Sequence, residues 1–326
     1  MPIESGIVTL ELWIIFFAIL SVTIAIDLGL IHKIKRKLTK ASSSELEHVM
    51  STKEALGWTI TWISLAGIFA GMIYFALGND KMIEFVTGYA LEKSLSVDNM
   101  FVFLLVFTTL GIPHKYQHRV LSVGILSAIV MRIVLIVVGA SLLDNFHWMI
   151  YIFGGLLWFT SIRMILQKEE KKIELEKNIA VRILKKFMPV NLNLVGNKFL
   201  VSINGVMHAT PLLVALAIIE LTDLVFAMDS IPAVLAITRD PFIVITSNVF
   251  AILGLRALYF LIGGMMERFH YLKPGLIVLL IFIGTKMIIS EFYHIETVTS
   301  LIIVFVILVT VMVASLLKKP KTVKSE

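Results

Sequence analysis

Apolar residues run along the chain in long, nearly uninterrupted stretches that lack the polar face of a soluble amphipathic helix. A helix that crosses a bilayer needs about 20 mostly apolar residues. Nine segments meet this condition, which predicts an all-α polytopic membrane protein. The nine predicted spans are residues 7–31, 55–77, 82–110, 120–143, 147–166, 212–238, 242–265, 274–290 and 297–317.

The composition agrees with this pattern. Of the 326 residues, 58% are apolar and 16% are charged, whereas soluble domains contain about 45–50% and 25%. A soluble enzyme and a DNA-binding protein are therefore excluded, and the net charge of +6 does not indicate a nucleic-acid partner. The absence of cysteine excludes disulfides, thiolate metal sites and thiol redox chemistry. The N-terminal segment lacks the basic region of a secretory signal, so we expect it to be the start of the mature chain.

The distribution of basic residues predicts an orientation. With the N-terminus outside, 22 of the 29 Lys and Arg residues fall on the inner side and two on the outer side. Basic segments stay in the cytoplasm, so the topology is N-out and C-in, with 318–326 as a basic tail. The cytoplasmic loop 167–211 then contains a charged, helix-like stretch over 168–188. Its end, 177–188, is expected to lie along the membrane surface, and Asn204-Gly205 predicts a hairpin. We interpret this loop as a connector or regulatory surface.

Two halves of the chain share an ordered series of polar positions. Each has two acids six residues apart, a mid-helix arginine, a Phe-His pair and a final basic residue. In residues 82–166 these are Glu92 with Asp98, Arg132, Phe146-His147 and Arg163, and in 212–290 they are Asp223 with Asp229, Arg256, Phe269-His270 and Lys286. We interpret the halves as three-helix repeats, formed by spans three to five and six to eight. Their predicted orientations are opposite, as in many secondary transporters. A duplication kept only for packing is the alternative.

Charged residues within the predicted spans are candidates for a functional site, because a charge at the bilayer centre costs about 2.5–3.5 kcal/mol on insertion scales. The central acids are Glu92, Asp98, Glu220, Asp223 and Asp229, and the central bases are Lys93, Arg132 and Arg256. With every carboxylate ionised, the set carries a surplus of two negative charges, which matches one divalent cation. Protonated carboxylates would remove that surplus.

Helical geometry groups some of these residues. Residues seven apart share a face, so Glu92 lies above Asn99 and Asp223 above Ser230. Asp98 and Asp229 lie about 120° from those faces on a straight helix. We expect Pro232 to break span six, which would free the Met228 carbonyl and let the acids converge. Span three has no proline, and a break there has less support.

The predicted ligands are oxygen atoms, which suit Mg²⁺, Ca²⁺ and Mn²⁺. No histidine lies deep in a predicted span, so Zn²⁺, Cu²⁺ and Ni²⁺ fit poorly. A structural salt-bridge network is the alternative, with Arg132 and Arg256 neutralising Asp98 and Asp229. Arg163 and Lys286 are expected to extend toward the membrane surface. Asp27 is either an acid on the access path or an ordinary interfacial charge.

Four long stretches resemble the TerC/Alx family of bacterial inner-membrane proteins. They are EKSLSVDNMFVF (92–103), MRIVLIVVG (131–139), 209–260, which contains ELTDLVFAMDS, and FIGTKMIISEFYHI (282–295). The resemblance implies a manganese efflux protein of the bacterial cytoplasmic membrane, related to the LysE transporter superfamily. By matched position it assigns the metal path to Glu92, Asp98, Asn99, Glu220, Asp223, Asp229 and Ser230.

The leading hypothesis is a secondary exporter of Mn²⁺, coupled to proton entry, with no permanently bound cofactor. Its partners would be the metal ion, protons and the lipid bilayer. Transport of Ca²⁺ remains an alternative, as does a channel in place of a carrier. A scaffold or metallation factor that uses the inner loop is a further alternative. An enzyme is not expected: a two-aspartate intramembrane protease fits Asp98 and Asp229 only superficially, and no GxxxxGK[ST] motif supports an ATP-driven pump.

Overall fold

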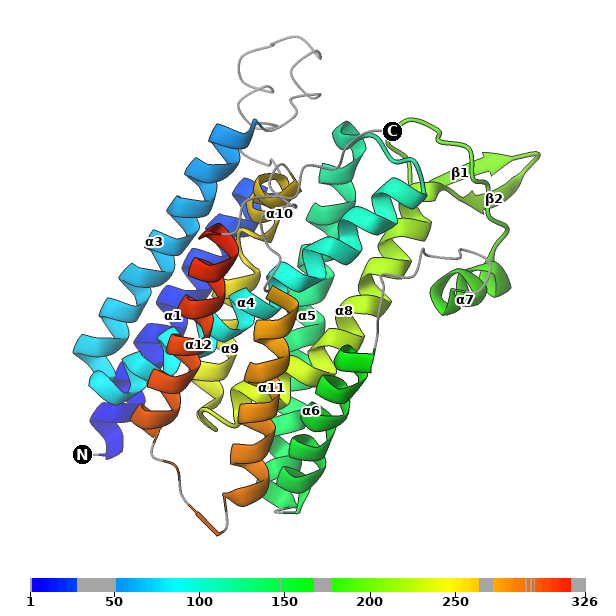
Figure 1. Ribbon diagram of the computed structural model, residues 1–326. Coiled ribbons are helices and arrows are strands. Elements are labelled where there is room, and N and C mark those ends of the chain that lie inside the picture. The colour runs from blue at the N-terminus through cyan, green and yellow to red at the C-terminus, as the bar shows by residue number, and fades with distance from the viewer. Residues whose placement is uncertain are drawn as a thin grey trace.

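The computed structural model describes residues 2–27, 51–146, 148–166, 178–263, 272–290, 292–293, 295 and 297–317. Over these residues the protein is a bundle of long helices with one small hairpin (Figure 1). The helices are α1 (Pro2–Asp27), α3 (Thr52–Leu77), α4 (Asn79–Thr109), α5 (His114–Asn145), α6 (Met149–Leu166), α7 (Ile179–Phe187), α8 (Pro211–Leu235), α9 (Pro241–Ile252), α10 (Leu255–Gly263), α11 (Leu272–Ile289) and α12 (Thr297–Leu317).

Every predicted span overlaps at least one of these helices. In the described part of the chain, five segments are long and apolar enough to cross a membrane: α3, α5, α6, α8 and the segment Pro241–Leu261. Shorter apolar stretches lie in α1, α11 and α12. Helix α4 carries more charge than these segments because it contributes several of the candidate site residues. The count of nine spans and the N-out orientation stay predictions.

The outer surface of the bundle is apolar, as lipid contact requires. Phe75 on α3 is 87% exposed and Phe159 on α6 is 66% exposed, and α5 exposes a run of valines that includes Val130, Val134 and Val138. Exposed apolar areas of this kind mark contact with a membrane or a partner. Several polar candidate residues, among them Glu92, Asn99, Arg132 and Asp223, lie instead in the interior.

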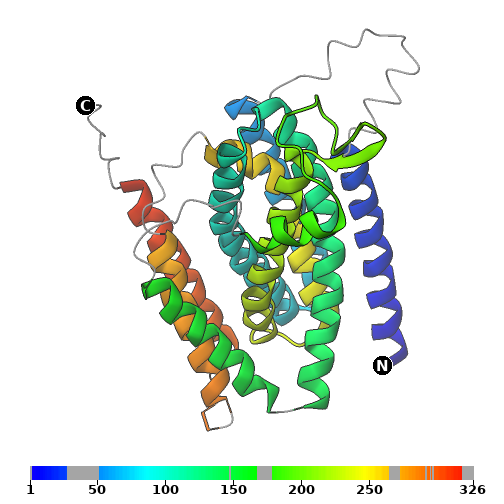
Figure 2. The ribbon, with the colours of Figure 1, turned by 90° about the vertical axis from the view of Figure 1, so that its right-hand side faces the viewer.

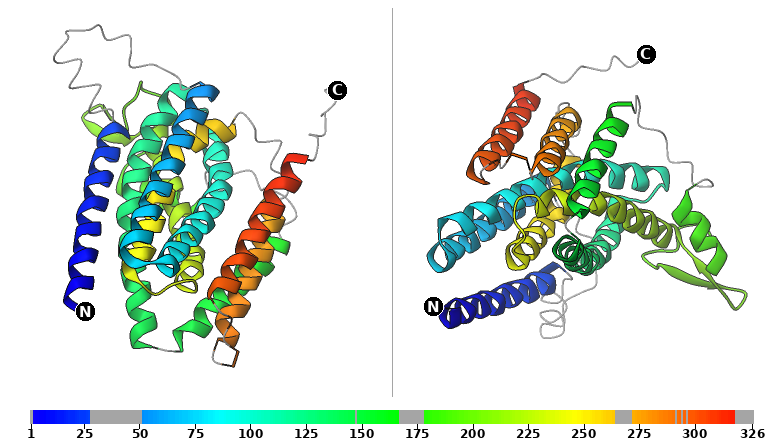
Figure 3. Two further views of the ribbon diagram at one scale, coloured as in Figure 1. Left: turned by 90° about the vertical axis from the view of Figure 1, so that its left-hand side faces the viewer. Right: turned by 90° about the horizontal axis from the view of Figure 1, so that it is seen from below.

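The helices form two groups. Figures 2 and 3 show α6, α11 and α12 as an inclined layer along one side, with α1 on the opposite side of the bundle. The most extensive helix–helix contacts are α6 with α11, α4 with α9, and α5 with α8. Each pair joins a helix of residues 82–166 to one of residues 212–290. If α4 corresponds to α8 and α5 to α9, this is the reciprocal packing expected of two units related by a twofold axis.

The seventh predicted span, 242–265, is not one continuous helix. It divides into α9 and α10 at Leu253-Gly254, where Gly254 has φ +81°. A Cβ atom on Gly254 would lie 2.4 Å from Cδ1 of Trp62, so only glycine fits both the backbone and the packing. Lys93 donates hydrogen bonds to the carbonyl oxygens of Ala251 and Leu253 at 3.1 and 3.3 Å. Its ammonium group thereby satisfies carbonyls at the end of α9.

The predicted break at Pro232 is wrong. Helix α8 continues through Pro232 to Leu235. Pro232 lies in the last turn, and backbone bonding resumes after it because the amide of Ala236 donates to the Pro232 carbonyl. A proline so near the end removes one hydrogen bond without dividing the helix. Met228 is 53% exposed, so its side chain is not directed into the interior.

The loop between the two halves has the predicted small elements. Strands β1 (Leu200–Ile203) and β2 (Val206–Ala209) form an antiparallel hairpin. The turn residues Asn204 and Gly205 both have positive φ, which confirms the hairpin predicted from this pair. Helix α7 buries Ala180 and Val181 and exposes Ile183 and Phe187. The part of the predicted helix over 168–177 lies outside the described residues.

Close packing of α6 on α11 depends on two glycines, which gives a stability prediction. A Cβ on Gly154 would lie 2.8 Å from Ile288 Cγ1 and 3.0 Å from the Gly284 carbonyl oxygen, whereas one on Gly155 would meet nothing within 4 Å. We expect Gly154→Ala to lower the free energy of unfolding by about 1–3 kcal/mol. Gly155→Ala is the matched control and should leave it unchanged or slightly raised. Thermal unfolding in detergent tests this, and equal stability of both variants would contradict the packing.

Candidate cation site

A buried arginine connects α4, α5, α8 and α9. Arg132 on α5 is 1% exposed and forms an ion pair with Glu92 on α4, which is fully buried. The same guanidinium donates to Asp223 Oδ1 on α8 at 3.2 Å. It also donates to Ser230 Oγ and Asn248 Oδ1, each at 3.3 Å. The helices that supply these partners belong to both predicted repeats.

This cluster, Glu92–Arg132–Asp223, leaves polar atoms unsatisfied. Within the part of the chain that the structure describes, Glu92 Oε2 and Asp223 Oδ2 are buried and have no hydrogen-bond partner. Ser96 Oγ and Arg132 Nε are also buried without one. A buried carboxylate oxygen without a donor is costly, because nothing replaces the water it has lost. The two free carboxylate oxygens are therefore suited to bind a cation or a proton.

Helix periodicity explains why these residues converge. Asp223 and Ser230, seven positions apart on α8, both contact Arg132, as the shared face predicts. Glu92 and Asn99 have the same spacing on α4, and both are buried. The faces predicted from the sequence are confirmed for these four residues.

Asp229 lies elsewhere. It is half-buried, and its Oδ1 accepts a hydrogen bond from Thr160 on α6 at 2.8 Å. Because α8 is not broken at Pro232, the 120° rotation between Asp229 and the Asp223–Ser230 face persists. The expected convergence of Asp229 with the other acids is therefore wrong. The side chains of Asp98 and Asp27 lie outside the described residues.

Glu220 is also separate from the Arg132 cluster. It is half-buried and accepts a short hydrogen bond from Ser127 on α5. It lies one turn before Asp223 on α8, beside a groove of about 340 Å³ that α7 helps to form. The groove is otherwise apolar, since it is lined by residues such as Met131, Leu184 and Phe187.

The basic residues other than Arg132 contact different partners from those expected. Arg256 lies beyond the α9–α10 break, and it donates to His118 Nε2 on α5 at 2.7 Å. Lys286 donates to the Ala236 carbonyl at the end of α8 and does not simply extend to the surface. Arg163 is exposed in the last turn of α6, and its extension toward the membrane surface stays a prediction.

Sequence reasoning missed Asn248 and the helix break. Asn248 is fully buried on α9, and its side-chain amide donates to the Val244 carbonyl while its oxygen accepts from Arg132. An asparagine within an apolar span is a signal that could have identified it. For the break, the isolated Gly254 in the middle of span seven was the available signal.

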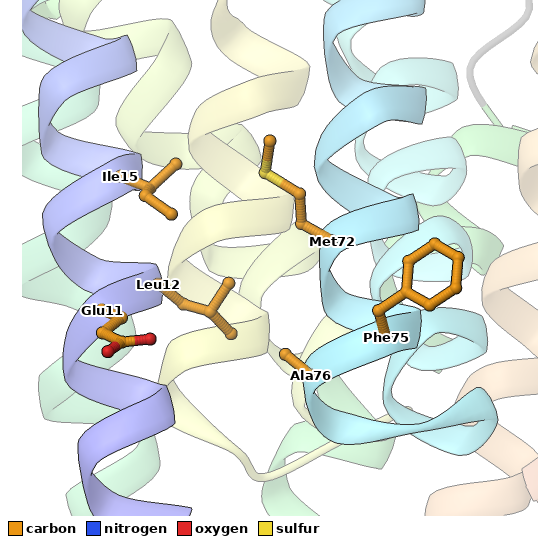
Figure 4. A pocket seen from close by; sticks show the side chains of 6 residues that line it. All are labelled: Glu11, Leu12, Ile15, Met72, Phe75 and Ala76. Carbon is orange, nitrogen blue, oxygen red and sulfur yellow. The ribbon is translucent and has the colours of Figure 1, made fainter.

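A second surface hollow lies on another part of the bundle. Figure 4 shows it as a groove of about 420 Å³ between α1 and α3, and Glu11 is the only charged residue among its described lining residues. One carboxylate among apolar side chains is a poor ligand set for a divalent cation. The described residues contain no group of three or more His, Cys, Asp or Glu side chains placed to bind a metal. Any ligand set here therefore mixes carboxylates with amide or hydroxyl oxygens.

Comparison with known proteins places these features in a family. Residues 77–323 match the family described as "Integral membrane protein TerC family". An uncharacterized membrane protein, STKORF319, of Myxococcus xanthus is 45% identical over 94% of this chain and 92% of its own length. Proteins named putative membrane-bound redox modulator Alx are 46% identical in Salmonella typhi, over 82% of this chain and 85% of that protein, and 42% identical in Escherichia coli K12, over 91% and 92%.

No solved structure matches the chain. The family match covers α4 to α12 and so includes every contact of the Arg132 cluster. Together with the apolar surface of the helices, it shows an integral membrane protein, and the chain belongs to the TerC family.

Proposed function

We propose that this protein exports Mn²⁺ from the bacterial cytoplasm as a secondary transporter, with Glu92 and Asp223 binding the ion. The observation that carries the proposal is the buried Glu92–Arg132–Asp223 cluster with its two unpartnered carboxylate oxygens. These oxygens come from α4 and α8, one from each predicted repeat. A site at the interface of inverted repeats is accessible from either side when one repeat rocks against the other.

The chemistry of the neighbouring side chains supports a hard divalent cation. Ser96 and Asn99 on α4, Ser230 on α8 and Asn248 on α9 are buried and add hydroxyl and amide oxygens. Oxygen ligands suit Mn²⁺, Ca²⁺ and Mg²⁺ better than Zn²⁺ or Cu²⁺. Mn²⁺ is proposed in preference to Ca²⁺ because of the family resemblance of the EKSLSVDN and ELTDLVFAMDS stretches, and Ca²⁺ remains the competitor to test.

Proton coupling follows from the same groups. A carboxylate binds metal only when it is deprotonated, so proton and metal compete for Glu92 and Asp223. A proton that enters from the periplasm would then release the metal outward. Glu220 and Asp229, which lie outside the Arg132 cluster, are proposed to line the path on α8.

The relatives named putative redox modulators raise a second question. This chain has no cysteine, so thiol–disulfide exchange is excluded as its own chemistry. If a redox effect accompanies this protein, an indirect one through the amount of cytoplasmic manganese is consistent with the proposal.

Conservative substitutions of the two carboxylates test the assignment. Glu92→Gln and Asp223→Asn keep the side-chain shape and remove a negative ligand. We expect each to lower ⁵⁴Mn²⁺ efflux from proteoliposomes by about 10- to 100-fold, because a neutral amide binds a divalent cation weakly. Glu11→Gln on α1 is the matched control, since Glu11 is exposed and lines the apolar groove between α1 and α3, and should leave efflux unchanged.

Folding is checked by size-exclusion chromatography of each variant. Wild-type-like efflux from both folded variants would show that these carboxylates do not bind the transported ion. A loss that is equally large in Glu11→Gln would show that the effect is not specific to the buried cluster.

The alternative scaffold function makes a different prediction about the inner loop. Deletion of 168–205 removes α7 and β1, whose surfaces would dock a partner. Because the Arg132 cluster lies within α4, α5, α8 and α9, we expect the shortened protein to retain Mn²⁺ efflux within about threefold of wild type. Complete loss of efflux from a folded deletion variant would make the loop part of the machinery. If neither the wild-type protein nor any variant shows strong Mn²⁺ efflux, the scaffold function is favoured.

A further inference from the structure

Arg132 occupies the position between two carboxylates that a divalent cation would need. Its Nη1 atom pairs with Glu92 and its Nη2 atom with Asp223. The remaining contacts of Nη1, to Ser230 and Asn248, use oxygens that are themselves suitable metal ligands. The guanidinium therefore already contacts much of the oxygen set that the proposed site offers.

The charge on Arg132 cannot be switched off. A guanidinium stays protonated in proteins, so this position always carries +1. With Glu92 and Asp223 ionised, the three groups sum to −1. If Arg132 withdraws and Mn²⁺ enters, the two carboxylates and the metal sum to zero. Neither state leaves two buried carboxylates facing each other without a cation, which is the arrangement that low-dielectric surroundings penalise most.

We propose that Arg132 is a tethered counter-cation that substitutes for the metal in the empty transporter. Metal entry displaces the guanidinium from Glu92 and Asp223, and metal release allows it to return. This inference rests on the proposed function and adds the reason that the empty carrier can reorient: its acids are partly neutralised by a residue of its own. The single remaining negative charge of the cluster is available to a proton.

The environment of Arg132 fits a group that moves. Its Nε atom is buried and has no partner among the described residues, so the guanidinium is held through one end only. Lys93, one residue after Glu92, is by contrast committed to the α9 carbonyls of Ala251 and Leu253. Lys93 is therefore placed to hold the helix break and does not replace Arg132 between the carboxylates.

If Arg132 had only a structural role, its removal would affect transport in a different way. Such a residue would hold α4 against α8, and its removal would damage every mode of transport equally. A tethered counter-cation is needed only when the carrier reorients without metal. Metal-for-metal exchange skips that step, since the site is occupied in both directions.

The experiment compares two transport modes in the same proteoliposomes. Vesicles loaded with ⁵⁴Mn²⁺ are diluted into buffer without metal, which measures net efflux, or into excess unlabelled Mn²⁺, which measures exchange. For Arg132→Gln we expect net efflux to fall by about tenfold or more while exchange stays within about threefold of wild type. Arg182→Gln, which removes an exposed arginine on α7, is the matched control and should change neither mode.

The lysine variant extends the test if Arg132→Gln does not fold. Arg132→Lys keeps the charge and loses the fork of donors that a structural role needs. For Arg132→Lys we expect the ratio of net efflux to exchange to stay within about threefold of the wild-type ratio. If a folded variant loses both net efflux and exchange, the counter-cation role of Arg132 is wrong. The proposed metal site at Glu92 and Asp223 is not contradicted by that result. Absence of any flux in the wild-type vesicles would overturn the proposed function and this inference with it.

Discussion

A charge buried at membrane depth must find partners of opposite sign, and in this protein that requirement falls on Arg132. Its guanidinium is almost fully buried and binds oxygens from α4, α8 and α9 while it projects from α5. Unpaired, it would cost far more than any single apolar contact returns. The central helices therefore have to cross where their polar faces meet, and the apolar faces are left to lipid.

Helix ends within the bundle pose the same problem in a weaker form. The break between α9 and α10 exposes carbonyl oxygens that no water reaches in a membrane. Lys93 binds two of them, and Lys286 binds the Ala236 carbonyl after α8. Lys93, which the sequence presents as a candidate ion partner, and Lys286, which was expected to extend toward the membrane surface, thus both bind carbonyls at helix ends. The acids of the site are correspondingly less neutralised than a count of intramembrane charges suggests.

Structural features that depend on local periodicity could be predicted from the sequence. Apolar length predicts the helices, because a long uniform apolar segment has few other stable states in a bilayer. The seven-residue spacing predicts the buried faces of Glu92–Asn99 and Asp223–Ser230, and the Asn204-Gly205 pair predicts the hairpin turn. Each of these predictions depends only on residues that lie within about two helical turns or one β-turn of each other.

The predictions that were wrong depend on contacts between segments that lie far apart in the sequence. Pro232 looked like a break, but its place in the last turn made it harmless, and the break occurred at Gly254, where Trp62 of another helix fills the space a side chain would need. The choice of partners for Arg132 and Arg256 follows from how α5 and α10 cross their neighbours. Periodicity within one segment carries no information about that crossing.

In the proposed site, a divalent cation binds between α4 and α8 at Glu92 and Asp223. Anomalous diffraction at the manganese absorption edge, from crystals of the wild-type protein grown with Mn²⁺, tests it most directly. We expect one strong peak within coordination distance of Glu92 Oε2 and Asp223 Oδ2, with the Arg132 guanidinium displaced. A manganese peak elsewhere, with Arg132 still between the two carboxylates, would contradict it.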